Sequence, residues 1–460
     1  FGSIRGALHF KSLCNKATLK KKYKIFITVK QGNFLILTMS ITPKTLRISP
    51  SFCTTLLSRT LLCSLCLVQL SACATGKDDV GANNSSNQKS SLMSENTSQL
   101  TNQNSSAKHQ QINQMRIMHI DLDYLYDKDN KQQTRNIQVL IQRIQALQPN
   151  TLFIQAFADP DGNGSADQVY FSNRHLPVRA NLFNDVVKQI REQTQVQHVY
   201  AWLPLMAWQL PSTQKLQYVE HSRGGKDGYI RLSPFVVENQ KIIADIFTDF
   251  IRENDVDGVL YHDDITLSDY EDASSAAQKI YQQWGFNSEA LLNDPKNLQQ
   301  GLFAQAKTAY LDDLAEKITK LMRETKPNLL IARNMYAQVT LEPNSEKWFS
   351  QSMASTYTHY DYNAIMAMPY MEKAPDHRQF YLDLIAHAKK YDPDLSRTIF
   401  ELQTTNWINQ TQIASTEIAN TVELLRQNGV RHIGYYPDDF VHQHPNIDVI
   451  KPAFSVDDSR

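Results

Sequence analysis

The sequence predicts a single (β/α)8 barrel of the TIM type, an α/β fold. Apolar, β-prone runs alternate with amphipathic segments, giving eight strands between residues 115 and 450. Acidic and aromatic side chains follow these runs, at the strand ends where active sites of this fold are built. A doubly wound open sheet is the alternative. It is less favoured because no glycine-rich phosphate loop follows the first strand.

The first four strands are short apolar runs separated by amphipathic helices. The first strand has the sequence RIMHIDLD, and the helix after it places Ile137, Ile141 and Ile144 on one face. The fourth strand, Gly258-Val259-Leu260-Tyr261, is a buried-strand run. In chain order, the predicted elements are strand 116–123, helix 132–147, strand 151–157, helix 182–193, strand 198–205, helix 233–251 and strand 258–261.

The second half repeats the alternation with four further strands. Its last helix ends at Asn428-Gly429, a common helix stop. In chain order, the predicted elements are helix 302–322, strand 329–332, connecting segment 348–353, strand 364–368, helix 376–390, strand 398–402, helix 413–427 and strand 432–435.

Residues 39–73 have the features of a secretion signal. Basic residues after Met39 precede an apolar run at 61–68 that is too short for an ordinary transmembrane helix, and the run leads to Leu70-Ser71-Ala72-Cys73. This LSAC sequence resembles a bacterial lipobox, so we expect Cys73 to be lipidated and to begin the mature protein. Ala74 after it, by resemblance to enterobacterial lipoproteins, favours the outer membrane. The alternatives are an ordinary cleaved signal peptide and an uncleaved anchor.

Composition divides the rest of the chain. Residues 1–38 show no evident fold, and we expect them to be an extension upstream of the true start at Met39. Residues 74–114 are rich in Ser, Asn and Gln, and cannot bury enough apolar surface to offset chain entropy. We therefore expect a flexible linker there, a barrel at 115–450 and a tail at 451–460.

The zero net charge hides an acidic barrel. Residues 1–73 hold 11 of the 47 Lys and Arg residues and no Asp or Glu, which leaves 36 basic against 47 acidic residues elsewhere. This balance argues against nucleic acid binding and suits a neutral or cationic ligand. All five cysteines lie within the first 73 residues, so the barrel has no disulfide and no cysteine metal site.

The fourth strand ends abruptly in acidic residues. Asp263 and Asp264 follow His262 directly, and Asp269 comes shortly after. Adjacent carboxylates are costly inside a sheet, so this strand is expected to open into a polar cavity. Two neighbouring carboxylates also favour general acid and base chemistry, because proximity separates their pKa values. Asp263, Asp264 and Asp269 are therefore the candidate catalytic residues; a solvated turn or a helix N-cap is the alternative.

Acids and aromatic residues also follow the other strands. This mixture suits a sugar polymer, whose ring faces stack on aromatic rings while its hydroxyl or amino groups form hydrogen bonds. The candidate substrate-binding residues are Asp121, Asp123, Asp127, Trp202, His262, Arg333, Asn334, Tyr370, Glu401, Trp407, Tyr436 and Asp438.

Several of these residues have a simpler interpretation. Asp123 and Asp127 would cap the first helix, Asp269 would hold its loop, and Trp202 would be barrel core. We expect no metal, because His119 and His262 have no third ligand at an informative spacing. The loop 159–164 lacks the closing Glu of a calcium loop and is interpreted as a turn.

Five strings carry a resemblance to a known family: HIDLDYLYD at 119–127, LFIQAFADPDGNG at 152–164, YFSNRHLPVRANLF at 170–183, VYAWLPLMAW at 199–208 and GVLYHDDITLSDYEDA at 258–273. Together they resemble the carboxy-terminal, glycoside-hydrolase-like domain of the PgaB family of the poly-β-1,6-N-acetylglucosamine (PNAG) biofilm system. The resemblance covers essentially all of residues 115–445.

The resemblance implies a barrel that binds partly de-N-acetylated PNAG in a groove and cleaves it without a cofactor. It also implies a periplasmic lipoprotein that works with an outer-membrane export porin. Asp263, Asp264 and Asp269 match the acidic cluster of the family. PgaB proteins normally begin with a metal-dependent deacetylase domain, whereas Cys73 to Met115 leaves room only for a linker, so we expect no deacetylase activity.

These expectations give a mechanistic hypothesis. Asp264 is the general acid, with its pKa raised by Asp263 and by burial, and Asp263 is a base, a nucleophile, or the group that orients a substrate amide. The acids that would select a cationic polymer are Asp121, Asp123, Asp127 and Asp438. The alternatives are a non-catalytic glycan-binding module that guides the polymer to an export pore, and a hydrolase of another glycan.

Overall fold

The fold was analysed in a computed structural model, which describes residues 112–211, 216–225 and 228–455. The predicted signal segment, the lipidation site Cys73 and most of the linker lie outside these residues and stay predictions. Within the described ranges, no helix is both long enough and apolar enough to cross a bilayer.

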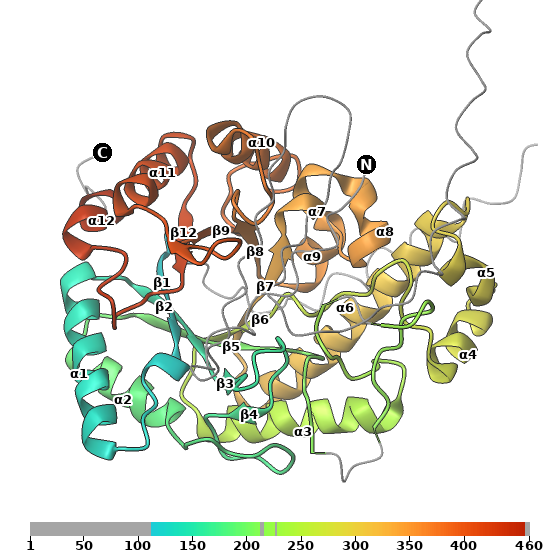
Figure 1. Ribbon diagram of the computed structural model, residues 1–460, viewed down its shortest axis with the longest axis horizontal. Helices are drawn as coiled ribbons and strands as arrows, with labels where there is room; N and C mark the ends of the chain where they lie inside the picture. The colour runs from blue at the N-terminus through green and yellow to red at the C-terminus, as the bar shows by residue number, and fades with distance from the viewer. Residues whose placement is uncertain (1–111, 212–215, 226–227, 456–460) are drawn as a thin grey trace, which may run out of the picture. The chain divides into compact units, whose positions relative to one another are not determined.

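Eight parallel strands close into a barrel (Figure 1). Each strand pairs with the barrel strand that precedes it in the chain, and the last closes on the first. The predicted (β/α)8 fold is therefore confirmed. The barrel strands are β1 (Arg116–Asp121), β2 (Thr151–Gln155), β5 (His198–Leu203), β6 (Gly258–Tyr261), β7 (Leu330–Tyr336), β8 (Tyr362–Ala367), β9 (Thr398–Gln403) and β12 (His432–Tyr436).

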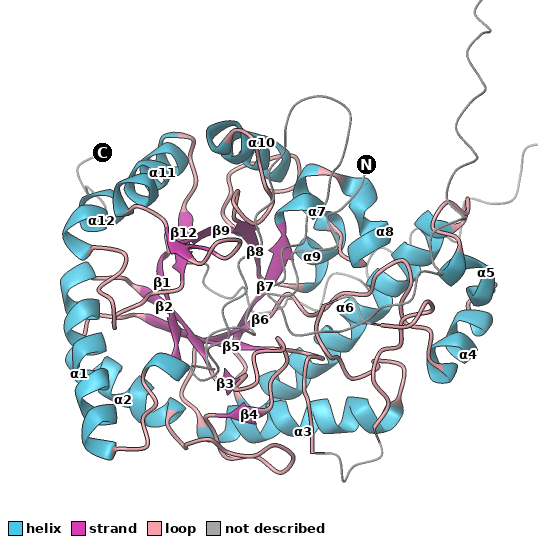
Figure 2. Cartoon of the chain, in the orientation of Figure 1, coloured by secondary structure: helices cyan, strands magenta, loops and turns pink. Residues whose placement is uncertain are grey.

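Helices surround the barrel (Figure 2). The buried residues of α1 and α3 recur at helical spacing along one face, as the sequence periodicity predicts. Asp129 caps the first helix by accepting the N–H of Lys131. The longer helices are α1 (Asn130–Leu147), α2 (Phe183–Gln193), α3 (Val237–Glu253), α6 (Gln300–Thr325), α10 (His377–Ala388), α11 (Ser415–Gln427) and α12 (Ile447–Phe454).

The barrel interior is tightly packed near its amino-terminal end. Tyr200 on β5 lies against Gly258 on β6, and a Cβ atom at position 258 would stand 2.3 Å from the tyrosine ring. It would also stand 2.7 Å from the carbonyl oxygen of Leu330. Only glycine fits at this crossing, because a side chain at position 258 would overlap the tyrosine ring and the neighbouring strand.

Several elements differ from the predicted boundaries. Strand β7 runs to Tyr336, past the predicted end at Ala332, so Arg333 and Asn334 lie inside the strand rather than after it. The elements that were not predicted are the 3-10 turns η1 (Leu122–Tyr124) and η2 (Pro343–Ser345), the hairpins β3 (Phe157–Ala158) with β4 (Gln168–Val169) and β10 (Thr405–Asn406) with β11 (Thr411–Gln412), and the helices α4 (Ser275–Gln283), α5 (Ser288–Asn293), α7 (Ala337–Leu341), α8 (Glu346–Phe349), α9 (Met353–His359) and α12 (Ile447–Phe454), the last of which crosses the predicted end of the barrel at residue 450.

Candidate active site

An aromatic cluster lies at the carboxyl end of the barrel, centred on Trp202. The indole ring of this β5 residue is 4.6 Å from His119 on β1, 4.8 Å from His262 after β6 and 5.3 Å from Tyr436 on β12, measured between ring centroids. The indole Nε1 has no hydrogen-bond partner among the described residues. Trp202 is buried, as the simpler interpretation requires, yet it packs against rings at the mouth of the barrel.

Trp407 extends this cluster outward. It lies in the turn between β10 and β11, partly exposed, with its ring centroid 6.0 Å from that of Tyr436 at an interplanar angle of 31°. A half-exposed ring that continues a buried aromatic cluster offers an apolar face to a flat ligand. Trp202, Tyr436 and Trp407 are thus brought together as the prediction requires.

Glu401 lies on β9 next to the same cluster. Its carboxylate contacts His119 Nδ1 at 3.2 Å and accepts a hydrogen bond from Asn334 Nδ2 at 2.5 Å. All three side chains are almost fully buried. The structure therefore assembles Asn334 and Glu401 at the inner face of the barrel, with His119 between Glu401 and Trp202.

Asp263 points toward this cluster as well. Its two carboxylate oxygens accept hydrogen bonds from the Tyr229 hydroxyl at 3.0 and 3.1 Å, and His262 Nδ1 lies 2.7 Å from one of them. Tyr336, at the end of β7, also donates its hydroxyl. Burial alone would raise the pKa of Asp263, but His262 and the two tyrosine hydroxyls together outweigh it and hold the pKa below 3.8. These contacts favour the ionised form of Asp263.

Asp264 faces a different part of the molecule. Its carboxylate is fully buried and accepts the backbone N–H groups of Leu205 at 3.1 Å, Met206 at 2.5 Å and Ala207 at 2.6 Å. Burial raises the pKa of Asp264, while His262 and the three backbone N–H groups lower it. This geometry gives Asp264 a part in holding the loop after β5, and its role as the general acid stays a prediction.

Asp269 lies in the long loop after β6 and is buried. Its charge acts on the buried Lys307 of α6, whose Nζ donates to the carbonyl oxygens of Ser268 at 2.7 Å and Glu271 at 3.0 Å. Burial lowers the pKa of Lys307 to about 8, against the raising effects of Glu271 and Asp269. Lys307 thus holds the loop that carries Asp269, and the charge of Asp269 next to it fits a loop-holding part. The catalytic role of Asp269 stays a prediction.

Two predicted substrate-binding residues form buried ion pairs. Arg333 is fully buried, with Nη1 2.7 Å from Asp312 on α6 and Nη2 donating to the Ile265 carbonyl at 2.7 Å, so it points out of the barrel. Asp438 is buried against Arg143 of α1, whose Nε lies 2.7 Å away. These pairings give both charges a structural part, and contact of Arg333 and Asp438 with substrate stays a prediction.

The acids after β1 have mixed environments. Asp121 is buried and accepts the N–H of Asp123 at the start of η1. Asp123 remains partly exposed; it accepts the Tyr170 hydroxyl and lies 3.9 Å from Arg179. Asp127 accepts the N–H of Asp129, which is the actual cap of α1. Asp123 and Asp127 are therefore not the caps of the first helix.

Tyr370 sits outside the aromatic cluster. Its hydroxyl donates to Glu417 of α11 at 2.9 Å, and its backbone N–H donates to Gln403, the last residue of β9. The ring is partly exposed after β8. Its contact with substrate stays a prediction.

The loop 159–164 forms a turn closed by its own hydrogen bonds. Asp159 accepts the N–H groups of Gly162, Asn163 and Gly164. Oxygens of Asp159, Asp161 and Asp167 lie within 4.8 Å of one another, and a second group of this kind in the described residues is Asp313, Glu316 and His359. Burial, followed by the charges of Asp161 and Asp159, raises the pKa of Asp167 to about 6. Exposed acidic groups of this kind are common without an ion.

The sequence did not identify Tyr229 and Tyr336 as site residues. It also did not place His119 in the site. Tyr229 belongs to the segment between β5 and α3, which has no motif to single it out. Tyr336 lies beyond the predicted end of its strand. His119 could have been found, because an even spacing from Asp121 on one strand puts both side chains on the same face.

Known proteins match this chain over the barrel. Residues 119–436 match the family GHL13, described as hypothetical glycosyl hydrolase family 13. Among solved structures, the glycoside hydrolase domain of PgaB (BpsB) from Bordetella bronchiseptica is 38% identical, with a TM-score of 0.70 over 74% of this chain and 99% of that domain.

Two curated relatives match the same part of the chain. They are the poly-beta-1,6-N-acetyl-D-glucosamine N-deacetylases of Escherichia coli strain K12 and of Escherichia coli O157:H7, each 39% identical over 355 residues, or 74% of this chain. The chain spans about half the length of these relatives, 52%.

Proposed function

Because this chain belongs to the GHL13 family of hypothetical glycosyl hydrolases, we propose that it is an endo-acting glycoside hydrolase. Its proposed substrate is partly de-N-acetylated PNAG. The observation that carries this proposal is the position of Asp263, whose carboxylate is held by Tyr229, Tyr336 and His262 beside the aromatic cluster of Trp202. Most glycoside hydrolases cleave their bond with two carboxyl groups, and a fixed carboxylate supplies one of them. Aromatic rings beside it offer apolar faces to a sugar.

The ionised state of Asp263 determines its role. A carboxylate with a lowered pKa is charged at neutral pH, so it stabilises the positive charge that develops on the sugar, attacks the anomeric carbon, or orients a 2-acetamido group. It does not deliver the proton. The proton donor in this proposal is Glu401 or Asp269, each a nearly buried carboxyl group near the carboxyl end of the barrel.

The substrate class follows from chemistry and from relatives. The rings of Trp202, Tyr436 and Trp407 provide apolar faces for pyranose rings. The partly exposed Asp123 and Asp127 supply negative charge on the same side, which favours a polymer carrying free ammonium groups. The curated relatives are named for poly-β-1,6-N-acetyl-D-glucosamine, and we extend this polymer to the present chain.

The cellular setting is part of the same proposal. The LSAC sequence ending at Cys73 supports lipidation, and the basic and apolar residues before it support export to the periplasm. A barrel anchored to the outer membrane would meet the polymer beside an export porin.

Incubation of the protein with partly de-N-acetylated PNAG, followed by mass spectrometry of the products, tests the proposal. Shorter oligosaccharides from the wild type, and at least about 100-fold fewer from Asp263→Asn, are expected. Glu401→Gln and Asp269→Asn identify the proton donor, because the donor's variant regains turnover on a substrate with a good leaving group. A wild-type protein that releases no products, yet binds the polymer as well as Asp263→Asn does, would instead support a glycan-binding module. Release of acetate would support a deacetylase.

A further inference from the structure

A buried ion pair lies behind the candidate active site and has no part in the proposed chemistry. Arg231, in the segment before α3, donates from Nη2 to both carboxylate oxygens of Glu271 at 2.8 Å. Both side chains are about 2% exposed or less. Apolar residues of similar volume are often as stabilising as a buried ion pair, because burying two charges costs desolvation. The geometry that this pair imposes on its neighbours is therefore its candidate role.

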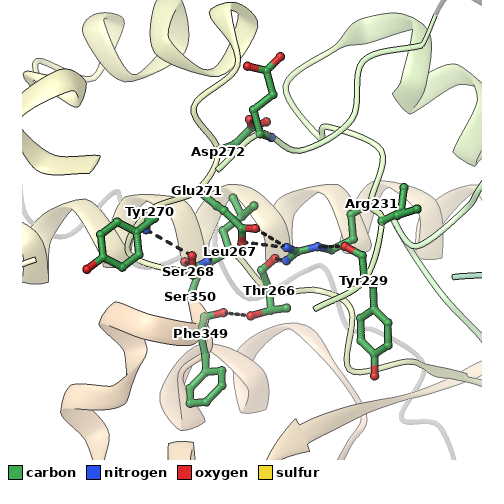
Figure 3. A network of polar contacts seen from close by, with 12 residues as sticks. Tyr229, Arg231, Thr266, Leu267, Ser268, Tyr270, Glu271, Asp272, Phe349 and Ser350 are labelled. Atoms are coloured by element: carbon green, nitrogen blue, oxygen red, sulfur yellow. Dashed lines mark hydrogen bonds and ion pairs between the residues drawn. The ribbon is translucent and has the colours of Figure 1, made fainter. Parts of the chain in front are cut away.

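The guanidinium of Arg231 joins separate segments of the chain (Figure 3). Besides Glu271, it donates to the carbonyl oxygen of Thr266 and, from Nε, to that of Tyr229 at 3.3 Å. Thr266 in turn donates its hydroxyl to the Phe349 carbonyl at 2.6 Å, beside the end of α8. One planar cation thus fixes the segment of Tyr229 against the loop after β6.

Tyr229 is the link from this network to Asp263. Its carbonyl is held by Arg231, and its hydroxyl donates to Asp263. Its ring packs so closely on Gly164 that a Cβ atom at that glycine would stand 2.5 Å from the ring. The Tyr229 side chain therefore has one place to lie, with its backbone fixed at one end and its hydroxyl on the carboxylate at the other.

We propose that Arg231 is a positioning residue that, paired with Glu271, holds the Tyr229 hydroxyl on Asp263. The pair acts through Tyr229 and does not touch substrate. The role in turnover rests on the proposed function, whereas the positioning of Tyr229 does not. A lysine cannot replace the arginine, because its single ammonium lacks the planar fork that spans three acceptors.

The groups that face Asp263 come from three segments. They are His262 beside it in the loop after β6, Tyr336 from β7 and Tyr229 from the segment before α3. Together these groups lower the pKa of Asp263 against the effect of burial. Loss of one tyrosine hydroxyl should therefore raise the pKa of this carboxyl group, and displacement of Tyr229 should act in the same direction.

The test is a double-mutant cycle with two readouts. The pKa of Asp263 is measured by 13C NMR of labelled aspartate in Tyr229→Phe, in Arg231→Lys and in the double variant. The Asp263 signal is identified by its absence from the spectrum of Asp263→Asn. Both single variants should raise the pKa of Asp263, and the double variant should raise it no further than Tyr229→Phe. With partly de-N-acetylated PNAG, Arg231→Lys should lower kcat roughly tenfold and change KM by less than about twofold.

Arg143→Lys is the matched control, because Arg143 forms a comparable buried pair with Asp438. It should reduce stability and leave the Asp263 titration unchanged. An Asp263 titration unchanged by Arg231→Lys, or additive effects of the two substitutions, would overturn the proposal. A wild type that does not cleave PNAG would refute the proposed function alone, since the NMR titration requires no turnover.

Discussion

Replacement of Asp264 by alanine distinguishes a loop-holding carboxylate from a catalytic one. The substitution removes the acceptor of three backbone N–H groups, those of Leu205, Met206 and Ala207. Each buried donor left without a partner costs about 1–3 kcal/mol. The sum exceeds about 3 kcal/mol, and relief from burying a charged group offsets part of it. We expect a loss of roughly 3 kcal/mol in the free energy of unfolding.

Asp264→Asn should be milder. The oxygen of Asp264 that accepts both Met206 and Ala207 can be reproduced by the amide oxygen, whereas the amide NH2 would face the N–H of Leu205. One N–H is then unpaired, and a loss of about 1–2 kcal/mol is expected. The folded variant should retain most of the wild-type kcat.

Urea denaturation followed by circular dichroism measures the stability of each variant, and product release from partly de-N-acetylated PNAG measures activity below the unfolding transition. Asp263→Asn is the control, because it should lose activity while keeping most of its stability. A stable Asp264→Ala protein, or a folded Asp264→Asn protein as inactive as Asp263→Asn, would refute the loop-holding assignment.

Two further predictions concern pH and ligand affinity. Burial lowers the pKa of His432 to about 4, and its Nδ1 accepts the N–H of Met115. Between pH 6.5 and about 4 the unfolded chain binds this proton and the folded chain does not, so acidification through this window should cost up to about 3 kcal/mol of stability. Urea titrations should show the excess stability of wild type over His432→Asn shrinking across it; a constant difference would contradict the prediction. Trp407→Ala should raise KM for PNAG oligosaccharides about 5–10-fold, because a stacking face is lost. Tyr391→Ala, which truncates another exposed ring, in the loop between α10 and β9, should leave KM unchanged, and equal effects would argue against a platform at Trp407.

The barrel was predictable because its elements repeat a simple physical pattern. Strands buried on both faces appear as short apolar runs, and each helix needs one apolar face. The fourth strand, 258–261, was predicted at its observed boundaries. The hairpins and short helices between strands were not, because they depend on contacts with other loops rather than on periodicity.

The candidate site was less predictable because position in the sequence does not fix where a side chain points. Asp263 and Asp264 lie in the turn after β6, and they point in different directions, one to the Tyr229 hydroxyl and one to the loop after β5. Arg333 and Asn334 lie inside β7, where neighbouring side chains alternate between the two faces. Adjacency in sequence suggested a carboxylate pair, but only the folded turn decides where each carboxylate points.

Other contacts of the site were unpredictable because they join residues that lie far apart in the sequence. Arg143 lies 295 positions before Asp438, and only the folded barrel brings them together. Likewise, the Tyr229 hydroxyl reaches Asp263 from 34 positions away. No local pattern in the sequence marks either contact.

The most direct test of the central claim compares wild type and Asp263→Asn on partly de-N-acetylated PNAG by mass spectrometry. We expect the wild type to release short oligosaccharides, and the variant to bind the polymer equally well while releasing at least about 100-fold fewer. An Asp263→Asn protein that cleaves at the wild-type rate would contradict the assignment of this ionised carboxylate to the chemistry.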